Sequence, residues 1–354
     1  MAAQEAELGT CRVMSIADAA PLPAGFPADA PEIAVEKVPN CPTCGATQRT
    51  HFAHGHDYEL ETCRNEWHFW QCDRCGTVWL DPRPAVGALP IIYPQHYYAY
   101  SMSDTFWPLA LKGKEILDHF KFSMILGNSR STPKSFLDVG CGDGRYLKMF
   151  AKRGISKERI YGLELSEAPV RRLREQGFQA YQQRVEECTQ IPEGTIDLAT
   201  MFHVIEHVAD PRDVVCRVAD WLSPGGVFAV ETPNIASWDA RLFKERWWGG
   251  YHIPRHWTLF HADSLQRLLK EAGLEVLRVA YQTGHSFWMY SFHHILKYNS
   301  RSPSPRLARL FDPLKDVPML IAFTGFDILR RFGGARTSAV LMIARKPTHA
   351  ELST

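Results

Sequence analysis

The stretch that most constrains the fold is "FLDVGCGDGRYL", which begins at Phe136. A short apolar run is followed there by three glycines at alternate positions, Gly140, Gly142 and Gly144. Glycine tolerates positive φ and carries no Cβ, so its backbone can turn sharply and lie directly against a ligand. A strand that leads into a helix through such a turn is typical of open α/β sheets, which bind ligands beyond the carboxyl ends of their strands.

The residues after Ser135 alternate between strand and helix patterns. Two of the helices carry start signals, because Ser166 precedes one and Asp210 with Pro211 precedes another. Strands separated by helices of this length predict crossover connections and a doubly wound, mostly parallel α/β sheet of seven strands. The expected strands are 135–140, 160–165, 178–185, 196–202, 225–233, 274–281 and 338–346, and the expected helices are 144–154, 166–177, 210–222 and 261–273.

Composition sets the broad class. The chain has 354 residues, 45% of them apolar and 22% charged, with a net charge of +1. These values are typical of a globular protein and give no sign of a polyanionic partner. The start, "MAAQEAELGTCRV", has no apolar signal region, and no apolar run approaches the roughly 18–20 residues of a membrane span. We therefore expect a cytoplasmic protein, in which paired cysteines bind metal more often than they form disulfides.

The glycine spacing distinguishes two kinds of nucleotide site. A dinucleotide fingerprint would place its third glycine at position 145, which is Arg145 here, and this disfavours a nicotinamide dehydrogenase. The G-x-G-x-G pattern resembles the motif of class I S-adenosylmethionine-dependent methyltransferases. Further segments of that family's pattern occur in the matching order, over roughly residues 100 to 282 and the final strand: Glu164 at a strand end, "RVEE" at 184–187, "MFHVIEHVADP" at 201–211 and "LSPGGVFAVETPN" at 222–234.

The resemblance implies a Rossmann-like methyltransferase fold with S-adenosylmethionine as cofactor. It places Asp138 and Gly140 near the methionine part, gives Gly142 and Gly144 a role in backbone clearance, and assigns the ribose hydroxyls to Glu164. An exposed strand-end carboxylate is the alternative for Glu164. Many members have Asp where this chain has Arg184, so the adenine contact is expected through backbone. The remaining implied cofactor residues are Cys141, Leu165, Val185, Glu186 and Phe202.

Two cysteine pairs precede this region. "CPTCG" supplies Cys41 and Cys44, and "CDRCG" supplies Cys72 and Cys75, with 27 residues between the pairs. Two such pairs form a four-thiolate site with no open position, which predicts structural zinc. The spacer is long for such a module, so we expect a hairpin between the pairs. Free thiols are the alternative for these four, and loop or partly buried residues are the simpler reading of Cys63, His51, His54, His56 and His68.

The charge of the cysteine segment argues against a nucleic-acid clamp. Between Cys41 and Cys75 three arginines face five acids, which gives −2 before the thiolates are counted. Affinity for phosphate backbones depends on basic contacts. A zinc module followed by "WLDPRP" and "YPQHYYAY" resembles a bacterial group of methyltransferases that often act on sugars and other secondary metabolites. Its nucleotide-sugar members carry a further C-terminal domain with no match in this sequence, which leaves a saccharide acceptor open.

Methyl transfer from a sulfonium is an in-line displacement, so the chain must align an acceptor and in some cases remove its proton. His203, at the end of the fourth strand, is the first candidate base, and His256 is the second. His207 is more typical of a packed, hydrogen-bonded residue, and a structural role is the alternative for His256. The aromatic stretch "WWGGYHIPRHWTLF" at 247–260 is either a wall of the acceptor pocket or core.

We expect a flexible tail (1–35), a zinc-binding module (36–85), a connector and helical cap (86–134), a methyltransferase core (135–282), a helical lid insertion (283–336) and a final strand with tail (337–354). From Tyr298 to Arg345, eight basic residues face three acids. One hypothesis is that residues 300–335 touch the inner face of a membrane. The simpler alternative is a lid packed on the core or a dimer contact.

The leading functional hypothesis is methyl transfer to oxygen or carbon of a small-molecule or saccharide acceptor. An RNA-modifying methyltransferase that uses the zinc module as a clamp is an alternative, which the acidic module disfavours. A non-catalytic scaffold that binds the cofactor is another, which the intact glycine turn and Glu164 disfavour.

Overall fold

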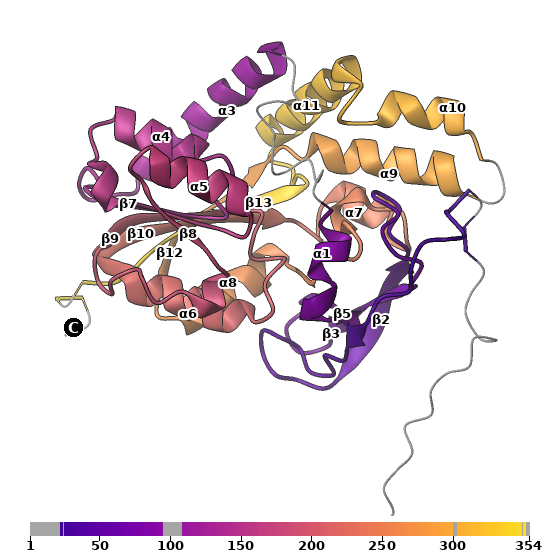
Figure 1. Cartoon of the computed structure of the whole chain (residues 1–354), viewed down its shortest axis with the longest axis horizontal. Helices are drawn as coiled ribbons and strands as arrows, with labels where there is room; N and C mark the ends of the chain where they lie inside the picture. Colours follow the sequence, from indigo (N-terminus) through magenta and orange to yellow (C-terminus); the bar gives the residue numbers. More distant parts are fainter. Residues whose placement is uncertain (1–21, 24, 95–107, 300–302, 349, 352–354) are drawn as a thin grey trace, which may run out of the picture.

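A central sheet organises the computed structural model, which describes residues 22–23, 25–94, 108–299, 303–348 and 350–351 (Figure 1). Seven strands lie in the order β12-β13-β10-β9-β6-β7-β8. β13 is antiparallel to both of its neighbours, whereas the pairs among β8, β7, β6, β9 and β10 are parallel. The predicted doubly wound, Rossmann-like sheet is confirmed. Its strands are β6 (Phe136–Val139), β7 (Ile160–Glu164), β8 (Gln179–Gln182), β9 (Ile196–Phe202), β10 (Leu222–Pro233), β12 (Glu275–Gln282) and β13 (Ala339–Arg345).

Helices cover both faces of this sheet. α3 (Pro108–Leu126), α4 (Arg145–Lys152) and α5 (Glu167–Glu175) lie on one face, and α6 (Pro211–Trp221) and α8 (Ala262–Glu271) lie on the other (Figure 1). α6 begins as predicted, because the carboxylate of Asp210 accepts hydrogen bonds from the N–H groups of Arg212 and Asp213. The expected cap of α5 is wrong. The Ser166 hydroxyl makes no capping bond, and the Ser166 N–H instead donates to the Glu164 carboxylate at 3.1 Å.

The core follows from this double covering. Strands covered on both faces have near-continuous apolar sequences, as "IDLATMF" does in β9. Leu198 and Met201 of β9 and Phe228 and Val230 of β10 are all fully buried. Burial of each such side chain contributes roughly 1.5–3 kcal/mol, so the middle of the sheet is its most strongly held part.

The cysteine-rich segment forms a second sheet that is joined to the core. The predicted hairpin is present as β2 (Arg49–Gly55) and β3 (Trp67–Cys72), and β3 continues the sheet to β4 (Val78–Leu80). The fourth strand, β11 (Thr258–Leu259), comes from the chain after β10 and pairs with β4. The short strands β1 (Val35–Glu36) and β5 (Arg83–Pro84) pair beside it. The module therefore shares a sheet with the core.

The expected tail is shorter than predicted. Residues 1–21 and 24 lie outside the described part of the chain. Within 25–35, however, Phe26, Ala30 and Ile33 are buried, and the Phe26 ring lies 5.7 Å from that of His56 and 6.2 Å from that of Tyr298. The expectation of a loose segment is wrong there, because an irregular backbone still buries an apolar ring between the module and α9 (His285–Tyr298).

The region 283–336 is helical, as expected. It contains α9, α10 (Pro305–Ala308) and α11 (Val317–Phe332), while residues 300–302 lie outside the described chain. α11 packs on α9 through stacked Trp288 and Phe323 rings and through buried Asp327, which accepts bonds from the Gly284 N–H and the Trp288 indole. Among the described residues, no helix is both long enough and apolar enough to cross a membrane. Between the module and α3, α1 (Leu89–Ile92) is described, and residues 95–107 of the connector are not.

Candidate active site

The glycine turn lies at the carboxyl end of β6, and its three glycines serve different ends. Gly140, Gly142 and Gly144 all have positive φ, at 76°, 51° and 74°. A Cβ on Gly140 would lie 2.3 Å from Val204, and one on Gly144 would lie 2.2 Å from Leu173, so these two allow close packing. A Cβ on Gly142 would meet nothing within 4 Å. Gly142 is therefore the position where bare backbone faces open space and a ligand can approach.

Two carboxylates flank this turn. Glu164 ends β7 and accepts hydrogen bonds from the N–H groups of Gly142 (2.9 Å), Leu165 (2.7 Å) and Ser166 (3.1 Å). Asp138 is buried in β6 and accepts a 2.6 Å bond from the Thr200 hydroxyl. Burial raises the pKa of Asp138 to about 7, against the opposing effect of the Thr200 hydrogen bond. A cation placed beside Asp138 would favour its ionised form.

The other predicted cofactor residues lie around this edge in different environments. The Cys141 thiol is buried, and burial raises its pKa well above the ordinary value. Leu165 is half exposed and Val185 is buried in a short turn of helix. The Glu186 carboxylate already holds Arg184 at 2.9 Å and the Ala209 N–H at 3.0 Å. The Phe202 ring lies 4.6 Å from the Lys121 ammonium.

These residues fit S-adenosylmethionine. The open face of Gly142 admits a nucleoside, Glu164 presents a fixed carboxylate to a diol, and Asp138 offers negative charge to a cationic group. When bound, this cofactor supplies an electrophilic methyl group. The alternative of Glu164 as a merely exposed carboxylate is not what the structure shows, since three backbone N–H groups orient it.

His203 lies immediately after β9 between two buried carboxylates. Its Nδ1 is 3.3 Å from Glu206 Oε1 and its Nε2 is 3.4 Å from Glu231 Oε1, while 42% of the His203 side chain remains exposed. Burial by itself would lower the pKa of His203, but the hydrogen bonds and charges of the two carboxylates raise it to about 9. His203 is therefore charged near pH 7 in this arrangement and must lose a proton before it can act as a base.

Lys121 of α3 completes this charged group. Its Nζ lies 2.6 Å from Glu231 Oε2. Burial acts to raise the pKa of Glu231, but Lys121 and His203 outweigh it and lower that pKa to about 2. The sequence reasoning missed Lys121, Glu206 and Glu231. The available signal for Glu231 was an acidic residue inside an apolar run, "VFAVETP". The same kind of signal, in a different run, marked Glu164.

His207 and His256 lie on the other side of Glu206. His256 Nε2 is 3.9 Å from Glu206 Oε1, and the His207 and His256 ring centroids are 4.6 Å apart. Burial lowers the pKa of His207 to about 4 and lowers that of His256 well below its ordinary value. The structure thus places both predicted candidates, His203 and His256, next to the Glu206 carboxylate. Near pH 7 the His203 imidazole is charged, whereas the His256 imidazole is neutral.

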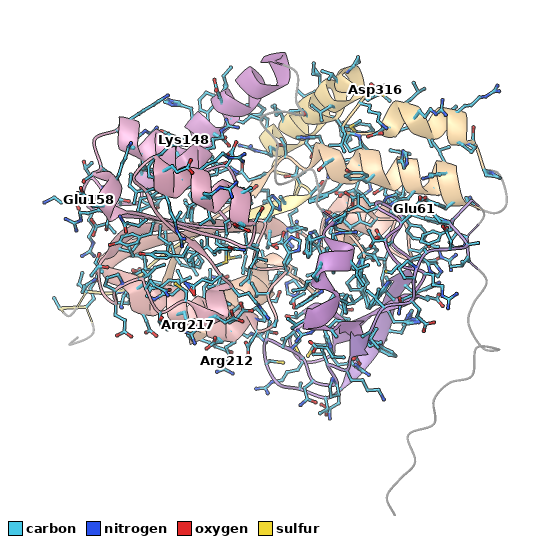
Figure 2. All side chains as sticks on the ribbon, viewed as in Figure 1. Glu61, Lys148, Glu158, Arg212, Arg217 and Asp316 are labelled. Atoms are coloured by element: carbon cyan, nitrogen blue, oxygen red, sulfur yellow. The ribbon has the colours of Figure 1, made fainter. Side chains whose placement is uncertain are left out.

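The aromatic stretch around these histidines is core. Trp248, Tyr251, Trp257 and Phe260 are each at most 2% exposed, so they do not line an open pocket wall. The same segment joins the core to the cysteine module, because Arg255 forms a fully buried ion pair with Asp57 at 2.8 Å. Figure 2 shows Glu61, another module acid, beside α9, where its Oε1 lies 2.9 Å from Lys297 Nζ.

The four predicted metal ligands come together. One sulfur from each of Cys41, Cys44, Cys72 and Cys75 lies within 4.8 Å of the others, and two of the sulfur pairs are 3.5 Å apart. Zn–S bonds of about 2.3 Å in a tetrahedron place sulfurs roughly 3.8 Å apart, so the set fits zinc. Gly45 and Gly76 adopt positive φ, as the two tight turns require. The hydroxyls of Thr43 and Thr77 lie 3.3 Å from the Cys75 sulfur, where they can donate to a thiolate.

Sequence comparison gives this architecture a family context. Residues 115–279 match a protein-family profile described as "Methyltransferase domain". The ubiquinone biosynthesis O-methyltransferase of Marinobacter nauticus is 36% identical over 109 residues, which cover 28% of this chain and 44% of that protein. The Cronobacter sakazakii protein of the same name is 37% identical over 113 residues, which cover 30% and 45%. The chain thus spans less than half the length of the curated relatives it matches.

Solved structures resemble the chain more distantly. S-adenosylmethionine-dependent methyltransferases from Mesorhizobium loti and Archaeoglobus fulgidus are 18% and 17% identical, with TM-scores of 0.40 and 0.41. They cover 60% and 65% of this chain, which correspond to 90% and 93% of their own. Scores this low carry no argument by themselves. The sequence match makes residues 115–279 similar to a methyltransferase domain, and the mostly parallel sheet lies largely within that range.

Proposed function

We propose that the protein is an S-adenosylmethionine-dependent methyltransferase that moves a methyl group to oxygen or carbon of a small-molecule or saccharide acceptor. The observation that carries the proposal is the turn at Gly142, whose open backbone lies between the carboxylates of Asp138 and Glu164. The names of the matched relatives, which are O-methyltransferases of ubiquinone biosynthesis, favour a small-molecule acceptor and oxygen as the methylated atom.

The cofactor side acts by binding and orientation. Glu164 accepts from the ribose hydroxyls while the backbone N–H groups of Leu165 and Ser166 keep its carboxylate in place. Asp138 lies in the neighbouring strand and faces the cationic methionine part in its ionised form. Val185 contacts the adenine through its backbone. The same space is bordered by the other expected cofactor residues, Cys141, Leu165, Glu186 and Phe202. Alignment of this kind is what an in-line displacement requires from the protein.

The acceptor side is assigned to His203. Its side chain is 42% exposed beside β9, whereas Glu206, Glu231 and His256 are buried behind it. His203 touches the acceptor and holds a proton on its exposed imidazole, and the two carboxylates stabilise the charge. His256, which the sequence suggested as a second base, acts here as a positioning residue through Glu206.

A glycine pair tests the cofactor site. Gly142→Ala adds a Cβ that meets no protein atom, so a loss of S-adenosylhomocysteine binding reports contact with the ligand itself. Gly154→Ala is the matched control, because Gly154 also has positive φ and also faces open space, at the far end of α4. We expect calorimetry to show at least tenfold weaker binding for Gly142→Ala and unchanged binding for Gly154→Ala. Equal affinities in both variants would show that the site is misplaced.

Structural zinc at the four cysteines is part of the proposal, and it keeps the module folded against the core. An RNA-modifying enzyme is disfavoured because the segment from Cys41 to Cys75 carries −2 before the thiolates are counted. The RNA-modifying alternative would regain support if the protein bound tRNA with an affinity that falls steeply as the salt concentration rises. A non-catalytic scaffold would bind S-adenosylhomocysteine and turn over no acceptor, so turnover with a panel of phenolic and saccharide acceptors distinguishes it from the enzyme.

Exposed apolar side chains between α10 and the end of α11 support the hypothesis of membrane contact. Leu310, Leu329 and Phe332 are 51%, 72% and 87% exposed, and Arg306 and Arg309 lie in the same segment. We propose that this segment, residues 305–332, rests on an anionic lipid surface. The double variant Leu329→Ser, Phe332→Ser is expected to float less with anionic vesicles than wild type or Val35→Ser, whose exposed valine lies on β1. Equal flotation of all three proteins contradicts the proposal.

A further inference from the structure

Glu206, His207 and His256 form a compact group of ligand-type side chains that methyl transfer as described does not use in full. One ligand atom from each lies within 4.8 Å of the other two. Glu206 and His256 come from segments 50 residues apart, yet the backbone fixes them together, because the Glu206 carbonyl accepts hydrogen bonds from the N–H groups of Trp257 (2.7 Å) and Thr258 (3.1 Å). The group is therefore held by the fold and does not depend on flexible side chains meeting by chance.

The two imidazoles are oriented from behind by main chain. His256 Nδ1 lies 2.8 Å from the carbonyl oxygen of Gly250, and His207 Nδ1 lies 2.9 Å from that of Arg255 and 3.0 Å from the Tyr93 hydroxyl, which can accept as well. A carbonyl can only accept, so each Nδ1 carries the hydrogen and each Nε2 keeps a lone pair. This arrangement, with one ring nitrogen anchored to a carbonyl and the other available, is the one that metal-binding histidines use.

Glu206 supplies the anionic partner. Its side chain is fully buried, and Oε2 accepts a 2.9 Å bond from the Thr232 hydroxyl. Oε1 makes no hydrogen bond of good geometry and lies 3.3 Å from His203 Nδ1 and 3.9 Å from His256 Nε2. Oε1 therefore faces the charged His203 on one side and the neutral His256 on the other, and a cation on the His256 side would be shared by a carboxylate oxygen and an imidazole nitrogen.

We propose that Glu206, His207 and His256 bind a divalent transition metal, separate from the four-cysteine zinc. Two imidazoles and one carboxylate suit Zn²⁺, Co²⁺ or Fe²⁺ better than Mg²⁺, which prefers oxygen ligands. Three protein ligands leave at least one position open, as in catalytic rather than structural sites. His207 is only half-buried, so the group has a side that an ion and an acceptor atom can reach.

The location gives the metal a use that rests on the proposed function. Glu206 also contacts His203, the residue assigned to the acceptor. A metal with an open position there would bind an acceptor oxygen and favour its deprotonated form. This deepens the acceptor class to molecules whose methylated or neighbouring group is an oxygen that can ligate a metal, such as a catechol or a hydroxy acid.

Cobalt titration tests the site without any activity measurement. The full chain is first given one equivalent of zinc, which the four thiolates hold most tightly, and zinc bound elsewhere is removed by dialysis against a weak chelator until one zinc per chain remains. Co²⁺ is then added and followed by equilibrium dialysis and visible absorption. We expect one further Co²⁺ per chain, with ligand-field bands but without the sulfur-to-cobalt charge-transfer bands of a thiolate site. His207→Gln and Glu206→Gln are each expected to weaken this binding more than tenfold, a loss that even outer-shell changes can cause. His119→Gln, which alters an exposed histidine of α3, should leave it unchanged.

Absence of saturable Co²⁺ binding in the wild type, or equal binding in His207→Gln, overturns the proposal. If the variants fail to fold, anomalous scattering at the cobalt edge from wild-type crystals decides the question by the position of the peak. S-adenosylhomocysteine calorimetry on the same zinc-loaded protein separates the two proposals. If S-adenosylhomocysteine binds and cobalt does not, only the metal site is contradicted. If cobalt binds and S-adenosylhomocysteine does not, only the cofactor site is contradicted.

Discussion

The two sides of the candidate site are built by different means. On the cofactor side, the decisive atoms come from residues 138 to 166, and Glu164 bonds to backbone N–H groups of the glycine turn and of its own strand exit. On the acceptor side, Lys121, His203, Glu206, Glu231 and His256 come from four separate segments. The first side is local in sequence, and the second exists only once the whole chain is folded.

The difference extends to charge. In the described part of the chain, Asp138 accepts from a hydroxyl and Glu164 accepts from backbone N–H groups, so both acids are available to a cationic ligand. On the acceptor side acids alternate with cations, from Lys121 through Glu231 and His203 to Glu206. We infer that the cofactor side recognises charge and that the acceptor side holds a proton in a defined place. The two sides should therefore respond differently to substitution.

The largest expected effect is on stability, and it comes from the buried ion pair that joins the cysteine module to the acceptor side. Arg255 is fully buried and binds both carboxylate oxygens of Asp57, at 3.0 and 2.8 Å. Arg255→Met leaves the Asp57 charge buried without its partner, which costs about 3–5 kcal/mol. Urea unfolding measures the loss. Arg217→Met is the matched control, since Arg217 pairs with Asp213 at the surface of α6 and is labelled in Figure 2.

The control should change the free energy of unfolding by less than about 1 kcal/mol, because exposed ion pairs contribute little. If Arg255→Met is no more costly than Arg217→Met, the acceptor side does not depend on the cysteine module, and the contrast drawn above fails.

Much of the fold could be predicted because its signals are local. Alternating apolar runs and helix patterns gave all seven strands of the sheet, and two C-x-x-C pairs gave the four-cysteine group. Pairing of β11 with β4 could not be predicted, since two residues, Thr258 and Leu259, carry no strand pattern. The buried position of Phe26 was also missed, because an Ala- and Pro-rich segment has no period to reveal which ring is buried.

The candidate site divides in the same way. The glycine turn, Asp138 and Glu164 lie within one strand-turn-helix unit and its neighbour, so the pattern of residues predicted their proximity. The pairing of His203 with Glu231 depends on β9 and β10 being adjacent in parallel register, where Phe202 lies opposite Glu231. No spacing in the sequence reports that register. For His203 the sequence suggested a base, whereas its charge state follows from the two carboxylates found only in three dimensions.

A smaller effect concerns the ionisation of Asp138. Its pKa is raised to about 7 by burial, so the folded chain without cofactor holds a proton that the unfolded chain releases near pH 4. This contribution to stability is present below about pH 4 and is lost as pH rises toward 7, by a few kcal/mol at most. Asp138→Asn cannot lose it, so its stability relative to wild type should rise between pH 4.5 and 7 and then level off.

Unfolding free energies across that range, measured without cofactor, check the expectation. Asp220→Asn, an exposed control at the end of α6, should follow the wild-type curve. With saturating S-adenosylmethionine the difference should shrink, because a cation beside Asp138 stabilises the ionised carboxylate. Parallel curves for Asp138→Asn and wild type would mean that the carboxylate is already ionised in the folded chain.

The smallest expected effect is on cofactor binding by a Glu164 variant. It distinguishes a residue that binds the ligand from one that only holds the glycine turn in place. Glu164→Gln keeps one oxygen acceptor but removes the charge, and loss of charge-assisted bonds to the ribose should weaken S-adenosylhomocysteine binding roughly tenfold, or about 1.4 kcal/mol. Glu158→Gln, at a labelled surface position in Figure 2, should bind as wild type does. If Glu164→Gln binds within twofold of wild type but unfolds at lower urea, its carboxylate serves the N–H groups of Gly142, Leu165 and Ser166 rather than the ligand. The cofactor side would then be held together by the same residue that was expected to bind the cofactor.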